Sequence, residues 1–234
     1  QKNIEIAIKH LGLSDSLSDE IEVGEHDYKR KNKLEKIEET LKNPDIKDSE
    51  KVKLVFKAVV IARELEFSAD KILGLIDRCI RISKKYGTKI EIAEAYSVAA
   101  WTIYWWYHDP ELYYEYYQEY EKRTIKEHNV HLFKDLVALW INLFSLTNEG
   151  VQGIDLQKHK RIVTDEFEAF IKDQTKPNTA LEARAAYIPF RIITEEDIES
   201  IVNEMFELLD ETTGHLDLDL SDIYKLIMEF PVIL

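Results

Sequence analysis

The stretch AEAYSVAAWTIYWWYHDPELYYEYYQEYEK, residues 93–122, predicts two helices in succession. Its apolar side chains recur at steps of three and four residues, the spacing that gives a helix one apolar face. Asp109 and Pro110 mark the break, because aspartate accepts a hydrogen bond at a helix start and proline suits the first helical turn. So short a break makes the two helices antiparallel neighbours. The stretch therefore predicts a helical hairpin with tyrosines packed between its helices.

The rest of the chain shows the same periodicity between recognisable helix caps. Thr88 with Glu91, and Thr194 with Asp197, have capping-box spacing. Only seven glycines and five prolines occur, too few for the many turns of an all-β protein. The sequence therefore predicts an all-α fold. The expected helices are 3–11, 27–43, 48–66, 69–86, 89–107, 110–128, 130–147, 154–174, 179–192, 195–211 and 221–229.

Two segments depart from simple helical periodicity. HLDLDLSD, residues 215–222, alternates apolar and acidic side chains like a strand, and we interpret it as a linker into the last helix. Pro189 lies inside the helix expected at 179–192. Proline removes a backbone donor and collides with the preceding turn, so we expect this helix to be kinked or shortened.

An internal repeat supports the hairpin interpretation. Residues 59–87 superpose on residues 101–129 with a shift of 42 residues, which places Arg81 on Arg123 and Gly87 on Asn129. The pairs at 130–174 and 179–211 continue the scheme with different loop lengths. This pattern is typical of stacked helical hairpins, in which each unit buries its faces only against its neighbours.

Residues 93–122 also resemble a tetratricopeptide repeat (TPR). They share the opening Ala-Glu-Ala-aromatic, a small Ala100 where the two helices approach closely, an acidic turn, and Tyr-Tyr-Gln at 116–118 with one residue inserted. The resemblance implies a right-handed α-solenoid of stacked antiparallel hairpins. The period of about 40 residues exceeds the family's 34 and is closer to that of HEAT repeats, so both subtypes stay open. We expect helices at 1–47, repeats at 48–211, and an acidic linker and final helix at 212–234, in one continuous domain.

Charge and cysteine content narrow the range of partners. The net charge is −14, and residues 195–234 hold twelve acidic residues and one lysine. Such a field repels phosphate, so we expect no direct nucleic-acid binding. The acidic segment forms either a solvated face or a docking surface for a basic partner.

The single Cys79 excludes a disulfide framework and favours a reducing compartment. No stretch approaches eighteen consecutive apolar residues. We expect a cytoplasmic protein that does not span a membrane.

Two tryptophans do not fit the hairpin interior. Trp101 and Trp105 lie four residues apart on the side of their helix that also carries Glu94. Either flanking repeats cover this side, or the tryptophans line the concave groove in which helical-repeat proteins hold peptides. Trp140, followed by Phe144, would extend the same surface. Aromatic rings beside a carboxylate suit a ligand with arginine or lysine, so we expect Glu94, Trp101, Trp105 and Trp140 to bind it.

Catalytic and metal-binding signals are weak. No Gly-rich phosphate loop, nucleophile elbow or zinc-protease motif occurs, and His128 with His131 lacks a third metal ligand. Arg123 and His128 have the spacing that resembles the Arg/His site of HEPN ribonucleases. The sequence therefore predicts a non-enzymatic protein- or peptide-binding module without metal or cofactor. The alternatives are the ligand-sensing domain of a peptide-responsive bacterial regulator and a HEPN-like ribonuclease.

Overall fold

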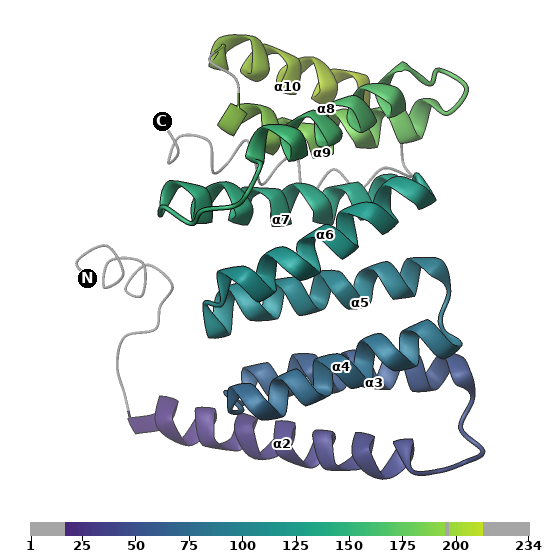
Figure 1. Ribbon diagram of the computed structural model, residues 1–234, viewed down its shortest axis with the longest axis vertical. Helices are drawn as coiled ribbons and strands as arrows, with labels where there is room; N and C mark the ends of the chain where they lie inside the picture. Colours follow the sequence, from purple (N-terminus) through teal and green to yellow (C-terminus); the bar gives the residue numbers. More distant parts are fainter. Residues whose placement is uncertain (1–16, 195–196, 213–234) are drawn as a thin grey trace. The chain divides into compact units, whose positions relative to one another are not determined.

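A computed structural model describes residues 17–194 and 197–212 of the 234-residue chain. Over these residues it contains nine α-helices, one π-helical turn and no strand, which confirms the all-α class (Figure 1). The expected helices at 3–11 and 221–229 and the linker at 215–222 lie outside the described residues. The helices are α2 (Leu17–Leu41), α3 (Asp48–Glu64), α4 (Ala69–Tyr86), α5 (Lys89–Thr102), η1 (Ile103–Tyr107), α6 (Pro110–Glu127), α7 (Val130–Asn148), α8 (Leu156–Lys172), α9 (Pro177–Thr194) and α10 (Ile198–Thr212).

The chain divides into two compact units after Ile82, within α4. In the first unit α2 packs on α3, whose buried side chains Val52, Val55 and Val59 recur at helical spacing. Arg78 on α4 forms an ion pair of 2.6 Å with Glu38 on α2. A buried stripe on one side of each helix therefore supplies the core of this unit.

The second unit begins with the hairpin predicted from residues 93–122. Thr88 caps α5 in a capping box with Glu91, as expected, and Asp109 caps α6 by accepting a hydrogen bond from the Leu112 N–H at 3.0 Å. Three tyrosines of α6 are fully buried, and small buried residues on α5 let the two helices approach closely. Much of the aromatic stretch is therefore core. The buried side chains are Ala93, Ala99 and Ala100 on α5 and Tyr113, Tyr117 and Tyr120 on α6.

Helix α7 occupies the centre of this unit and packs against α5, α6, α8 and α9 (Figure 1). Within residues 17–194 and 197–212, it is the one helix long and apolar enough to cross a membrane by length and composition. More than half of its apolar window is buried inside the protein. The packing of α7 among four other helices therefore explains its apolar composition.

Helices α9 and α10 differ in detail from the sequence expectation. Helix α9 continues through Pro189 to Thr194, so of the two expected effects, a kink or a shortening, the shortening does not occur. The expected Thr194–Asp197 capping box is also not formed, because Thr194 still belongs to α9. Its carbonyl oxygen accepts a hydrogen bond from Lys160 Nζ at 3.0 Å. Asp197 caps α10 instead, accepting from the Ser200 N–H at 3.0 Å.

Candidate functional site: an aromatic cavity between three helix ends

The last turn of the helix expected at 89–107 is π-helical, not α-helical. The turn η1 covers Ile103–Tyr107, and the His108 N–H donates to the Ile103 carbonyl oxygen at 2.9 Å, five residues back. His108 closes the turn in the left-handed region, with φ of 51°. Single π turns are rare in proteins and are frequent at functional sites. This turn places four consecutive aromatic residues, 104–107, at the end of α5.

The end of α7 faces the same region and has its own specific geometry. The Val151 N–H donates to the Leu146 carbonyl oxygen, and the Gly150 N–H donates to that of Thr147. Gly150 has a φ of 94°, so this is a glycine-terminated Schellman motif. The motif turns Val151 back towards Leu146 and leaves Glu149 exposed at the helix end.

A cavity of about 230 Å³ opens between the end of η1, the start of α6 and the end of α7. Tyr104 and Trp105 form one side, with ring centroids 5.0 Å apart and planes at 81°. Trp105 is 50% exposed, whereas Tyr113 is fully buried. The cavity is therefore an open recess lined by both an exposed and a buried aromatic side chain. Its lining residues are Tyr104, Trp105, His108, Asp109, Pro110, Tyr113, Leu146, Glu149 and Val151.

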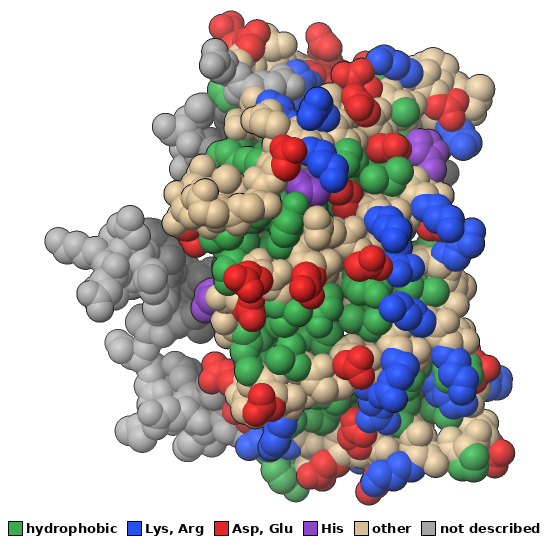
Figure 2. All heavy atoms as spheres, viewed as in Figure 1, with side chains coloured by type: hydrophobic (Ala, Val, Ile, Leu, Met, Phe, Trp, Pro, Cys, Tyr) green, Lys and Arg blue, Asp and Glu red, His purple; other side chains and the backbone are tan. Residues whose placement is uncertain are grey.

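The electrostatics of the cavity favour a positively charged ligand. Asp109 and Glu149 contribute carboxylates, and no lysine or arginine lies among the described lining residues. The carboxyl-terminal ends of η1 and α7 add partial negative charge, while Asp109 offsets the positive amino end of α6. Over α5 and α6, Figure 2 shows hydrophobic side chains at the surface with both acidic and basic side chains among them.

The structure brings Trp101 and Trp105 together, but Trp105 alone of the four predicted binding residues lines the cavity. Trp101 and Trp105 have ring centroids 5.7 Å apart. The prediction that Trp140 extends this surface is wrong, because Trp140 is 1% exposed and packs on Phe144 and Phe190. Helix α7 is covered by four other helices, so its aromatic side is core.

Glu94 is half-buried and does not line the cavity. It lies seven residues before Trp101 on α5, about 10 Å along the helix axis. Burial raises the pKa of Glu94 above its ordinary value, and the nearby carboxylates of Asp135 and Glu91 raise it further. Glu94 therefore supplies no counter-charge in the cavity.

Replacing Glu94 with glutamine should slightly stabilise the protein at pH 7. A raised folded-state pKa means that the folded protein disfavours the charged carboxylate, so stability is lost as pH rises through that pKa. Glutamine removes this cost, and the gain should fade as the pH falls to about 4, where glutamate takes up a proton in both states. Thermal unfolding at the two pH values measures the difference. Exposed Glu115 provides the control, since Glu115→Gln should show no comparable gain at pH 7.

A buried polar network joins α6 to α8 and was not anticipated from the sequence. His159 Nδ1 lies 2.8 Å from Glu121 Oε1, and the Tyr117 hydroxyl donates to the same oxygen at 3.0 Å. On the other side of the ring, the Tyr114 hydroxyl lies 2.9 Å from His159 Nε2. Burial and the Glu121 carboxylate raise the pKa of Tyr117 well above its ordinary value, so this hydroxyl remains a donor. The network holds the two helices together.

The residues of the HEPN-like spacing are engaged in separate internal contacts. Arg123 pairs with Glu119 at 2.8 Å and lies over the ring of Tyr96. His128 stacks on Phe170, with ring centroids 4.1 Å apart, and its Nδ1 lies 3.2 Å from Glu166. Among the described residues, no three histidine, cysteine or acidic side chains are grouped to hold a metal ion.

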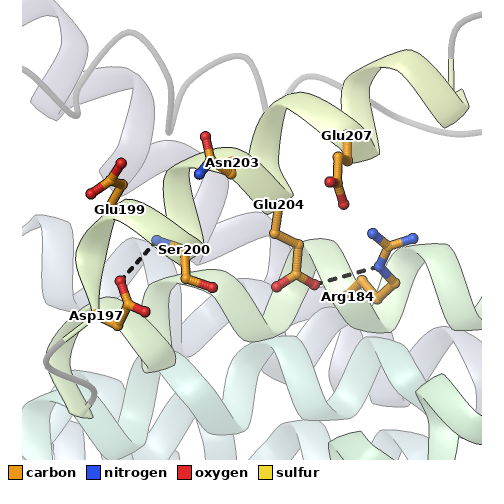
Figure 3. Close-up of a pocket in the computed structure, with 7 residues that line it drawn as sticks. All are labelled: Arg184, Asp197, Glu199, Ser200, Asn203, Glu204 and Glu207. Atoms are coloured by element: carbon orange, nitrogen blue, oxygen red, sulfur yellow. Dashed lines mark hydrogen bonds and ion pairs between the residues drawn. The ribbon is translucent and has the colours of Figure 1, made fainter.

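A second, polar pocket of about 520 Å³ lies along α9 and α10 (Figure 3). Glu199, Asn203 and Glu207 follow one side of α10, while Glu204 points towards Arg184 of α9. The Arg184 guanidinium pairs with both Glu204 and Glu211, so the one arginine of the pocket is already neutralised. The pocket is therefore a seam between two packed helices. Most of the acidic segment expected as a second contact surface lies outside the described residues.

Comparisons with protein-family models, with curated proteins and with solved structures gave no match for this chain. The candidate site therefore rests on the residues and geometry described above.

Proposed function

We propose that the protein is a non-enzymatic helical-repeat module that binds a basic peptide segment of another protein through the aromatic cavity. The observation that carries this proposal is the half-exposed Trp105 on a cavity with two carboxylates and no lysine or arginine among its described lining residues. Ligand sites for whole small molecules typically measure about 300–1,000 Å³. A cavity of about 230 Å³ suits a single inserted side chain better, which favours a peptide or protein partner.

Helix packing in the second unit supports the stacked-hairpin architecture in this proposal. Helices α5 and α6, α7 and α8, and α9 and α10 pack as successive pairs. The first helices of the pairs also pack in order, α5 against α7 and α7 against α9. This order of contacts is the one expected of TPR- or HEAT-like solenoids, in which each pair packs on the next. A right-handed arrangement belongs to the proposal.

The net charge and the thiol support the proposed partner and compartment. A net charge of −14 raises the encounter rate with basic segments and disfavours nucleic acid. Cys79 is buried and forms no disulfide, which suits a reducing compartment, and we place the protein in the cytoplasm.

An array of immobilised random peptides, probed with the labelled full chain, tests the function. We expect retained peptides to be enriched in lysine and arginine. Trp105→Ala should weaken retention at least about tenfold, as expected for removal of a central aromatic contact residue. Trp106 is also exposed but does not line the cavity, so Trp106→Ala provides the matched control and should change retention less than about twofold. Equal retention by the Trp105 variant and the wild type would refute binding at the cavity.

A further inference from the structure

The protein already holds one guanidinium group between an aromatic ring and a carboxylate. Arg123 Cζ lies 4.8 Å from the centroid of the Tyr96 ring, and its Nη2 lies 2.8 Å from Glu119 Oε2. A guanidinium can meet a ring with its flat face while an N–H at its edge meets a carboxylate. This pairing of ring and carboxylate therefore occurs within the second unit itself.

The aromatic cavity offers the same two elements with no lysine or arginine among its described lining residues. Trp105 supplies a half-exposed indole ring, and Glu149 supplies an exposed carboxylate at the end of α7. Asp109 is less available, because one of its oxygens accepts the hydrogen bond that caps α6. Glu149 is thus a more available counter-charge than Asp109, and Trp105 supplies the exposed ring of the cavity.

Resting on the function proposed above, we infer that the cavity recognises the guanidinium of one arginine in the partner peptide. Arginine fits better than lysine because a planar guanidinium stacks flat on a ring and still presents N–H donors at its edge. The ammonium group of lysine is compact, so it makes a good contact with either the ring or the carboxylate, but not with both at once. The volume of about 230 Å³ admits one such side chain, which makes a single arginine the specificity-determining residue.

A titration of the full chain with Nα-acetylarginine methylamide tests this inference, with a defined small probe in place of the partner peptide. The indole N–H signals of the four tryptophans are followed by NMR and assigned with single Trp→Phe variants. We expect the Trp105 signal to shift to saturation with a dissociation constant on the order of 1 mM, appropriate for a single side chain. Trp140 is 1% exposed, and its unchanged signal serves as an internal control.

Two analogues and two variants complete the experiment. Nα-acetylcitrulline methylamide has nearly the same shape without charge and should bind at least about fivefold more weakly, and the lysine analogue should fall between the two. Glu149→Gln should weaken arginine binding about two- to fivefold, as for an exposed ion pair. Glu115→Gln makes the same change in net charge away from the cavity lining and should leave binding unchanged.

Equal binding of citrulline would overturn the inference of a cation site, and equal or tighter binding of lysine would overturn guanidinium specificity. Absence of any Trp105 shift would overturn both. The proposed function is judged separately, because retention of array peptides through Trp105 does not require that they contain arginine. Retention that depends on Trp105 but not on arginine content would leave the function standing and remove this inference.

Discussion

Trp140→Ala is expected to lower the free energy of unfolding by about 3–5 kcal/mol, the range for deleting a large buried aromatic side chain. Trp140 is 1% exposed on the central helix α7, and its ring centroid lies 4.6 Å from that of Phe190 on α9. Alanine would leave a cavity between these two helices. Because typical domains are stable by only about 5–15 kcal/mol, much of the total would be lost.

Chemical denaturation measures the free energy of unfolding of Trp140→Ala, and Trp105→Ala provides the comparison. The second variant removes the same side chain from a position that is 50% exposed, and we expect it to lose about 1 kcal/mol or less. A comparable loss from both variants would contradict the assignment of one tryptophan to the core and the other to the cavity. A small loss for Trp140→Ala together with weaker peptide binding would place Trp140 at the surface.

His159→Ala is expected to destabilise the protein by about 3–5 kcal/mol, because it leaves a buried carboxylate without its main partner. Glu121 and His159 are both buried, and their side chains meet at 2.8 Å between α6 and α8. The Tyr117 hydroxyl would still donate to Glu121, which does not replace the lost contact.

The matched test replaces both partners with apolar residues. The double variant Glu121→Leu/His159→Leu removes the buried polar groups together, and replacing both partners of a buried hydrogen bond with apolar side chains can cost little stability. We therefore expect it to be more stable than His159→Ala and Glu121→Ala. A double leucine variant as unstable as the sum of the single Glu121→Leu and His159→Leu variants would show that the groups do not interact.

The helices were predictable because their signals are local. The expected helix at 69–86 matches α4 at both ends, and Asp109 with Pro110 fixes the start of α6. The π-helical turn was not predictable, because its five residues satisfy the helical pattern equally well as α or π. Tyr104 in this turn packs on Tyr113 of α6, with ring centroids 5.3 Å apart, and local periodicity does not report such a contact between elements.

The predicted binding site was only partly correct, because sequence periodicity reports the faces of one helix and not its packing against others. Helical angles place Trp101 and Trp105 on one side of α5, but they do not say which sides of α7 other helices cover, and so Trp140 was misplaced. The polar network joins residues 38 positions apart, beyond any local pattern. A signal was nevertheless present, because Glu121 follows Tyr113 and Tyr117 at four-residue steps on a buried stripe. A charged residue on a buried helix face needs a buried hydrogen-bonding or oppositely charged partner.

Amide hydrogen exchange of the full chain, with and without the best-retained array peptide, tests the binding site most directly. If the cavity holds the peptide, the backbone amides of residues 101–113 and 145–151 should exchange more slowly in the complex, and those of α10 should not change. Protection confined to α8–α10, or absent from the three helix ends that form the cavity, would contradict the account.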